Sequence, residues 1–180
     1  MNTENSDTQK LDKNVNQKEL IKQFIIIKIG NVYSAIDIKK IVEIIKYTPF
    51  TKVPKAPDFL EGVIDVRGTI IPIVDMRKRF DVLSDKPDKN ARIVIVRVLD
   101  KVAGLILDEV KEVLKVPESK VMPPPQIAKG IGSEYLSGVV SDKKRIIMVL
   151  ELDKILSTTE KIQFEKLIFK DKKQKTGGKR

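Results

Sequence analysis

The sequence predicts a mainly β fold made of two small five-stranded barrels. Short runs of β-branched residues recur along the chain, and Gly, Pro, Asn or Asp bound each run, as expected for strands. About five such runs fall in each half of the chain, a number that closes most easily into a small barrel. The same pattern of apolar residues, acids and glycines occurs twice in the same order, which indicates a duplicated unit.

The first predicted element is a hairpin over residues 23–37. Gly30 and Asn31 form its turn, after the apolar strand FIIIKI. The next segment, IKKIVEIIKY, fits both a helical and an alternating pattern. We expect a helical turn over residues 38–41, followed by a strand that starts at Val42.

The most apolar stretch of the chain, residues 60–80, predicts a tight hairpin followed by a short helix. Arg67 and Gly68 lie between two β-branched runs, and Gly68 tolerates the positive φ that a tight turn needs. Pro72 has no N–H to donate, so we expect its strand at a sheet edge or at a bulge. The helix should span residues 76–80, with a basic face made by Arg77, Lys78 and Arg79.

The second half of the chain repeats these elements. Strands are predicted over residues 91–99 and 102–107, and a further hairpin over residues 135–140 and 145–150. The turn of that last hairpin, Ser141 to Lys144, is expected to be longer than the first and merely polar. This difference is a weak indication that the first copy has a separate task.

The repeat is clearest where residues 35–44 match residues 104–113. The shorter matches follow in the same order, and they are Gly62–Ile64 with Gly138–Val140, Ile70–Ile71 with Ile146–Ile147, and Val74–Met76 with Leu150–Leu152. We therefore expect the first barrel at about residues 23–83 and the second at about residues 90–156, with a groove between them.

Composition excludes several functional classes. The 180 residues include no His and no Cys, which rules out Ser-His-Asp and Cys-His nucleophile systems, His or Cys metal sites, phosphohistidine and disulfides. No run approaches the roughly 20 apolar residues of a membrane span, and the polar N-terminus does not resemble a secretory signal. We expect a cytoplasmic protein without a cofactor.

The net charge of +10 is concentrated at one end of the chain. From Lys166 onward seven basic residues stand against one acid, so more than half of the excess lies there. We expect a disordered tail over residues 1–20 and an ordered domain over residues 21–160. Residues 161–180 should form a short helix followed by a basic tail.

The residues around the tight hairpin resemble the motif of CheW-like chemotaxis coupling proteins. In that family a Gly and an apolar pair precede Asn-Leu-Arg-Gly, and an apolar stretch with Pro and then Asp-Leu-Arg follows. The motif here is Gly62-Val63-Ile64-Asp65-Val66-Arg67-Gly68-Thr69-Ile70-Ile71-Pro72-Ile73-Val74-Asp75-Met76-Arg77. An upstream family pattern, apolar-any-Glu-Ile, matches Ile41-Val42-Glu43-Ile44. The sequence departs from the family at Asp65 and Val66, where Asn and Leu are usual.

The resemblance implies two SH3-like barrels and an adaptor without enzymatic activity. CheW-like proteins bind the cytoplasmic tip of a methyl-accepting chemoreceptor and the regulatory domain of the histidine kinase CheA, and they reach the membrane only through receptor arrays. The residues that inherit a coupling role are Val66, Arg67, Gly68, Ile41, Glu43 and Ile44. The residues that inherit a supporting role in the motif are Gly62, Asp65, Pro72 and Asp75. The extra charge of Asp65 could orient Arg67 or partly mask it from an acidic partner.

Two other functional classes fit the residues less well. An enzyme would need paired carboxylates in a defined cleft, whereas Asp108 and Glu109 are sequence neighbours whose side chains usually diverge. A small-barrel protein that binds nucleic acid is the alternative, because the basic tail could give weak, salt-sensitive binding. The aromatic residues that would stack on bases are scattered along the chain, so no nucleic-acid partner is expected.

Overall fold

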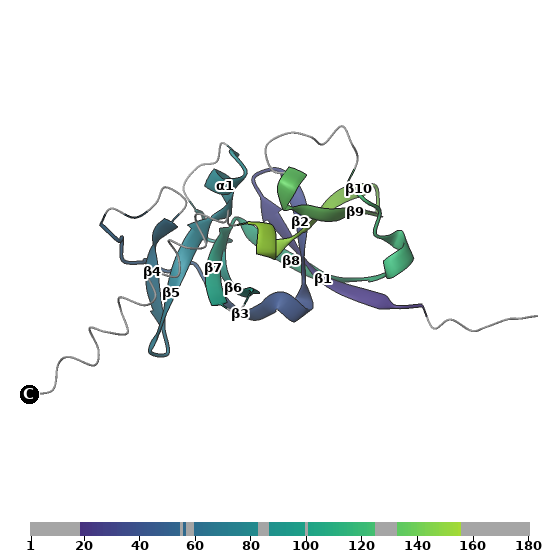
Figure 1. The fold of residues 1–180 in the computed structure, drawn as a ribbon. Helices are drawn as coiled ribbons and strands as arrows, with labels where there is room; N and C mark the ends of the chain where they lie inside the picture. Colours follow the sequence, from purple (N-terminus) through teal and green to yellow (C-terminus); the bar gives the residue numbers. More distant parts are fainter. Residues whose placement is uncertain are drawn as a thin grey trace, which may run out of the picture.

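The computed structural model describes residues 19–54, 56, 60–82, 87–99, 101–124 and 133–155. This part of the chain is mainly β and forms two five-stranded sheets, each rolled into an SH3-like barrel, which confirms the predicted fold class. Figure 1 shows the two barrels side by side. The predicted tails over residues 1–20 and 161–180 lie outside the described residues, apart from Glu19 and Leu20.

Ten strands and a few short helical pieces make up the described part of the chain. The strands are β1 (Ile21–Ile29), β2 (Val32–Asp37), β3 (Ile41–Lys46), β4 (Leu60–Val66), β5 (Thr69–Asp75), β6 (Arg92–Val98), β7 (Lys101–Leu107), β8 (Glu109–Pro117), β9 (Leu136–Asp142) and β10 (Arg145–Leu150). The helical pieces are α1 (Met76–Arg79) and the 3-10 turns η1 (Ile38–Lys40), η2 (Glu118–Lys120), η4 (Ser133–Tyr135) and η5 (Leu152–Lys154). The predicted helical turn before β3 and the predicted hairpins are confirmed.

The strand order shows how the two copies of the repeat combine. One sheet, here called barrel A, has the order β8-β1-β2-β10-β9, and the other, barrel B, has the order β3-β6-β7-β5-β4. The repeat matches each of the first five strands with the strand five places later, and under that correspondence the two orders are identical. Each barrel therefore takes its first hairpin from one copy and its other three strands from the other copy.

This exchange corrects the predicted division into barrels at residues 23–83 and 90–156. The β1–β2 hairpin belongs to the first copy but pairs with strands of the second. Strand β1 pairs with β8, and β2 runs parallel to β10 with Ala35 opposite Val149. The β6–β7 hairpin crosses in the other direction, and β7 runs parallel to β5. The two barrels are interlocked, so neither is a consecutive piece of the chain.

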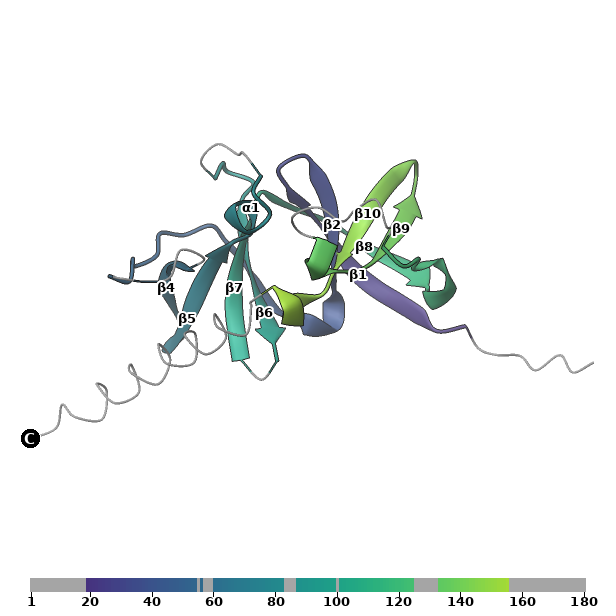
Figure 2. The same cartoon turned by 45° about the horizontal axis from the view of Figure 1, so that its top comes forward.

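The apolar core has three parts. One cluster fills barrel A and includes Phe24 and Ile26, and a second fills barrel B. A third cluster lies between the barrels and takes the alternate residues Ile25 and Ile27 of β1, together with residues of β6 and β7. Figure 2 shows β1–β2 and β6–β7 on the two sides of this shared core. Because β1 is buried on both faces, its sequence is apolar without alternation.

Pro72 lies on an interior strand of the barrel B sheet, so the expectation of an edge or a bulge at this residue is wrong. Its strand β5 has neighbours on both sides, β4 and β7. Val63, which faces Pro72 from β4, exchanges its backbone hydrogen bonds with Thr51 at 2.8 Å and 2.9 Å, and the pairing with β7 begins only at Ile73. Pro72 therefore occupies a position where neither neighbouring strand needs its N–H.

The two motif glycines lie where a proline-rich connection crosses a barrel edge. A Cβ atom at Gly62 would be 2.4 Å from the carbonyl oxygen of Thr51, and one at Gly138 would be 2.8 Å from that of Met122. Thr51 and Met122 form β-bridges to the residues that follow these glycines. A side chain at either position would push the connection off its barrel, which explains why Gly stands in both copies.

Candidate partner-binding surface

The turn between β4 and β5 carries Arg67 at an exposed tip. Arg67 and Gly68 have φ values of 52° and 83°, the two positive values of a type I′ hairpin turn. The Asp65 carboxylate accepts the N–H of Gly68 at 2.6 Å, and thus fixes the turn. The side chain of Arg67 is 81% exposed. The turn therefore presents a guanidinium to solvent from a well-defined backbone.

Arg67 pairs with Glu43 across the closing edge of barrel B. Its Nη2 atom lies 3.0 Å from Oε1 of Glu43, which stands on β3, at the opposite end of the strand order from β4. The described contacts therefore join Arg67 to Glu43, while Asp65 serves the turn backbone. An exposed pair of this kind stabilises a protein by at most about 1 kcal/mol. A carboxylate from a partner can take the place of Glu43 at little cost in stability.

Strand β3 presents apolar side chains beside this ion pair. A bulge between Ile41 and Glu43 leaves Val42 without a cross-strand partner. Val42 is 52% exposed, and Ile44 is exposed as well. Ile41 instead packs against the shared core. The exposed and half-buried residues of β3 alternate regularly. Sequence reasoning missed Val42 because the family pattern allows any residue at its position.

Four of the six expected coupling residues lie together in the structure. With Val42 they form what we call the Glu43–Arg67 surface, whose residues are Val42, Glu43, Ile44, Arg67 and Gly68. The other two expected residues, Val66 and Ile41, are half-buried and pack against apolar clusters. They support the surface from beneath and offer it little exposed area.

Barrel A carries an equivalent turn and a similar ion pair. Lys143 and Lys144 have φ values of 45° and 66° between β9 and β10, so the prediction of a longer second turn is wrong. Glu112 is the repeat equivalent of Glu43, and its Oε1 lies 2.7 Å from Nη2 of Arg145. Both barrels therefore close with an arginine from the last hairpin on a glutamate from the facing strand.

Arg145 is held more firmly than Arg67. It also donates to Asp142 at 2.8 Å, lies 5.2 Å from the ring centroid of Tyr33, and is only 25% exposed. The hydrogen bond from Arg145 lowers the pKa of Glu112, and the same bond is the main cause that raises the pKa of the Arg145 guanidinium. In barrel A the arginine is committed to contacts within the protein.

Asp75 and Arg77 form a buried ion pair at the junction of the barrels. Asp75 accepts hydrogen bonds from the backbone N–H, the Nε and the Nη2 of Arg77 at 2.9, 2.9 and 2.5 Å. The two bonds from the side chain are the main cause that raises the pKa of the Arg77 guanidinium. Nη1 lies 3.5 Å from Asp108, whose other oxygen accepts the N–H of Gly30 at 2.5 Å. The side chain of Arg77 is 8% exposed, so the basic face predicted for residues 76–80 does not include it.

The Glu43–Arg67 surface offers recognition chemistry: a planar donor fork, a carboxylate and two aliphatic side chains. Among the described residues, no three His, Cys, Asp or Glu side chains gather as a metal site requires. No helix in the described ranges is long and apolar enough to cross a membrane.

Comparison with known proteins places the chain in a family. The family model described as CheW-like domain matches residues 23–160. The chemotaxis protein CheW of Klebsiella aerogenes is 33% identical over 77% of this chain and 83% of that protein. The chemotaxis protein CheW of Treponema pallidum is 34% identical over 77% of this chain and 84% of that protein.

A solved structure supports the same assignment. The scaffolding protein TtCheW from Thermoanaerobacter tengcongensis is 31% identical to this chain, with a TM-score of 0.72. The match covers 78% of this chain and 91% of that one. The motif residues, the paired barrels and these matches agree, and the chain belongs to the CheW-like family.

Proposed function

We propose that this protein is a non-enzymatic chemotaxis adaptor that couples the cytoplasmic tips of chemoreceptors to the histidine kinase CheA. It would act in the cytoplasm, at membrane receptor arrays. The names of its relatives, chemotaxis proteins and a scaffolding protein, support the adaptor role. The observation that carries the proposal is the exposed guanidinium of Arg67, which has one exchangeable carboxylate partner beside exposed aliphatic residues.

The geometry suggests how such a surface engages a partner. An acidic side chain of the partner replaces Glu43 on Arg67, and apolar partner residues cover Val42 and Ile44. The type I′ turn fixes the backbone beneath Arg67 before binding, which reduces the entropy lost when the complex forms. Binding also removes water from the Arg67 guanidinium. Its bond to a partner carboxylate is therefore stronger than the solvent-exposed bond to Glu43 in the free protein.

Size-exclusion chromatography tests the proposal. The full chain is mixed with the regulatory domain of the cognate CheA and with a soluble receptor-tip fragment, and co-elution is measured. We expect wild type to co-elute with both and the Arg67→Glu variant to co-elute less, because a carboxylate there repels an acidic partner and leaves Glu43 without its cation.

The matched control is Arg97→Glu, which makes the same charge change at an exposed residue of β6 outside the Glu43–Arg67 surface. This variant should co-elute like wild type. Absence of any complex between wild type and both cognate partners would overturn the adaptor function. Equal co-elution of wild type and Arg67→Glu would keep the adaptor function and remove Arg67 from it.

A further inference from the structure

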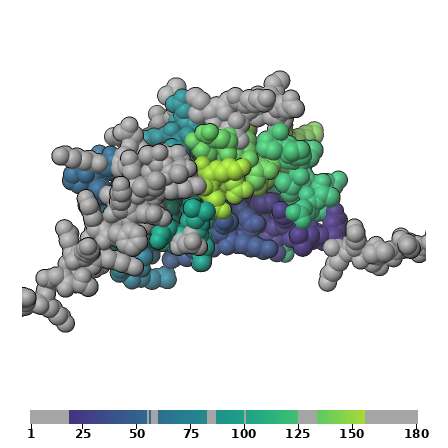
Figure 3. All heavy atoms as spheres, viewed as in Figure 1, coloured from purple at the N-terminus to yellow at the C-terminus, as the bar shows by residue number. Residues whose placement is uncertain are grey.

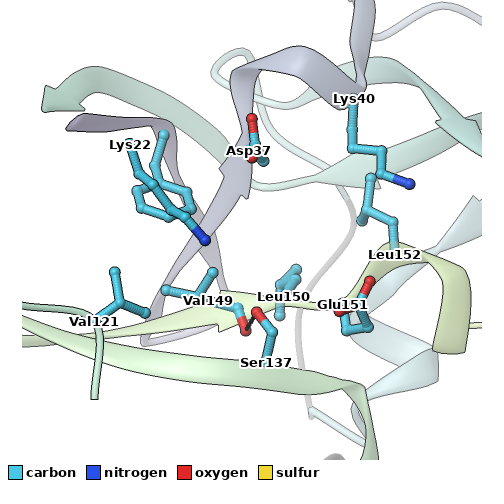
Figure 4. A pocket seen from close by; sticks show the side chains of 10 residues that line it. Lys22, Asp37, Lys40, Val121, Ser137, Val149, Leu150, Glu151 and Leu152 are labelled. Atoms are coloured by element: carbon cyan, nitrogen blue, oxygen red, sulfur yellow. Dashed lines mark hydrogen bonds between the residues drawn. The ribbon is translucent and has the colours of Figure 1, made fainter. Parts of the chain in front are cut away.

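Barrel A contains a hollow that the Glu43–Arg67 surface does not share. Its volume is about 210 Å³, and its walls come from β1, from the end of β2 with η1, and from β9, β10 and η5. Figure 4 shows side chains from these segments arranged around it, with Asp37 and Glu151 on different walls. The segment from β10 to η5, yellow-green in Figure 3, lies in the middle of the face shown there.

The size of the hollow limits what it can hold. Sites for drug-sized ligands and cofactors usually measure roughly 300–1,000 Å³. At about 210 Å³ this hollow is too small for a nucleotide and large enough for one long side chain. The expected occupant is therefore a single residue of a larger molecule.

The inner wall of the hollow is apolar. It is formed by Phe24, Val149, Leu150 and Leu152, which are all buried in the protein. Such a wall suits methylene groups, and long charged side chains characteristically pack their stems on apolar surface while the charged end stays near water. The occupant should therefore have an aliphatic stem.

The two lysines at the hollow are already paired. Nζ of Lys22 lies 2.8 Å from Glu118, and Nζ of Lys40 lies 2.7 Å from Asp153. Each ammonium thus has a carboxylate partner that does not itself line the hollow. The positive charges that line it are neutralised locally.

The two carboxylates at the hollow are not paired with any cation in the described part of the chain. Asp37 accepts one backbone N–H, from Lys39 at 2.9 Å, and the Glu151 carboxylate makes no hydrogen bond or ion pair there. Ser137 adds a hydroxyl oxygen, whose proton is directed to the carbonyl of Val149 at 3.3 Å. The groups still able to accept a bond are therefore all oxygens, which favours a cationic donor.

We propose that this hollow binds a lysine or arginine side chain of a protein partner. The stem packs on Leu150 and Leu152, and the charged end donates to Glu151 and Asp37. No part of this argument uses the Glu43–Arg67 surface, so the site can be tested without any chemotaxis partner.

Nuclear magnetic resonance titration of the full chain tests the proposal, with Nα-acetyl-lysine N-methylamide as the probe. We expect saturable shifts of the Ser137, Val149 and Glu151 amides, with a dissociation constant of about 1 mM, as suits one side chain. The norleucine analogue, which keeps the aliphatic stem without the charge, should shift these amides at least tenfold less at equal concentration.

Substitutions then identify the acceptor. Glu151→Gln should weaken binding of the lysine probe at least tenfold, whereas Glu134→Gln, at an exposed glutamate that does not line the hollow, should leave it unchanged. Equal shifts with the lysine and norleucine probes, or unchanged binding in Glu151→Gln, would overturn the proposal.

A deletion of residues 170–180 distinguishes a partner from the chain's own basic end. We expect the amide signals of Ser137, Val149 and Glu151 to be the same in the full and shortened chains. If the deletion shifts these signals and tightens binding of the lysine probe, the occupant is this chain's own tail, and the assignment to a partner is wrong.

Discussion

The two barrels have the same strand order and each is closed by an arginine–glutamate pair, yet the two arginines differ in exposure. In barrel B the arginine is 81% exposed and has one carboxylate partner, Glu43. In barrel A the arginine is 25% exposed and has two carboxylates and an aromatic ring around it. The two glutamates are repeat equivalents, whereas Arg67 corresponds to Lys143 and Arg145 to Thr69, so the arginine stands at a different position in each hairpin. Only the arginine of barrel B leaves its guanidinium largely open to solvent.

The junctions between the barrels differ in a similar way. On one side the N–H of Gly30 bonds to Asp108, which pairs with the buried Arg77. On the other side the N–H of Leu99, the repeat equivalent of Gly30, bonds to Asp153 at 2.8 Å, which pairs with Lys40 near the surface. An aspartate therefore holds each exchanged hairpin, but only Asp108 pairs with a buried cation.

The largest expected effect is the difference in stability lost when the cation at each junction, Arg77 or Lys40, is removed. Arg77→Ala leaves Asp75 and Asp108 without their cation, and breaking a buried pair typically costs about 3–5 kcal/mol. Lys40→Ala removes a partly exposed pair and should cost at most about 1 kcal/mol. Urea unfolding of both variants measures the difference, and equal losses would show that the two junctions are energetically alike.

A core substitution should come next in size. Ile71 is 4% exposed inside barrel B, and Ile71→Ala should lower the free energy of unfolding by roughly 2–5 kcal/mol. The control is Ile146→Ala in barrel A, where the side chain is 70% exposed and the change should stay within about 0.5 kcal/mol. A loss below about 1 kcal/mol for Ile71→Ala in urea unfolding would mean that this site is not tightly packed.

Adding a side chain at one of the equivalent turns and removing it at the other should change the stability in opposite directions. Gly30 and Leu99 have φ values of 57° and 52°. A Cβ at Gly30 would lie 2.3 Å from Val82, so Gly30→Ala should destabilise by more than about 1 kcal/mol. Leu99→Gly removes the strain of a left-handed leucine, offset by chain entropy, and should stabilise by less than about 1 kcal/mol. Thermal unfolding distinguishes the two signs, and a stabilising Gly30→Ala would contradict this account.

The smallest effect concerns acid pH and barrel A. Because Arg145 holds the folded-state pKa of Glu112 below its unfolded value, the contact stabilises fully above the ordinary glutamate pKa of about 4.3. That contribution is lost as the pH falls through the lower folded-state pKa. Carboxyl nuclear magnetic resonance should show a depressed pKa for Glu112 that returns to the ordinary value in Arg145→Gln. An unchanged pKa in that variant would remove Arg145 as the cause.

Local patterns predicted much of this structure from the sequence. The hairpins, the turn before β3 and the repeat follow from the spacing of apolar residues and turn residues. The exchange of hairpins depends on parallel pairings such as Ile73 with Gly104, which join distant segments and leave no local signal. The tight turn at Lys143 and Lys144 was hidden because neither residue is the glycine that usually marks positive φ.

The candidate site was predictable in part for the same reason. The family motif identified Arg67 and Glu43, but their contact joins two ends of a strand order that only barrel closure brings together. The burial of Arg77 was missed because its second partner, Asp108, lies on the other side of the exchanged hairpin. Basic residues in a short helix look exposed until the charges around them are known.

The most direct test measures stability and binding together in Arg67→Glu. We predict that its free energy of unfolding falls by less than about 1 kcal/mol, since the lost ion pair is exposed. Its affinity for the CheA regulatory domain, measured by titration calorimetry, should fall at least tenfold, or about 1.4 kcal/mol. Unchanged affinity, or a loss of stability as large as that of Ile71→Ala, would contradict the claim that barrel B keeps its arginine for a partner.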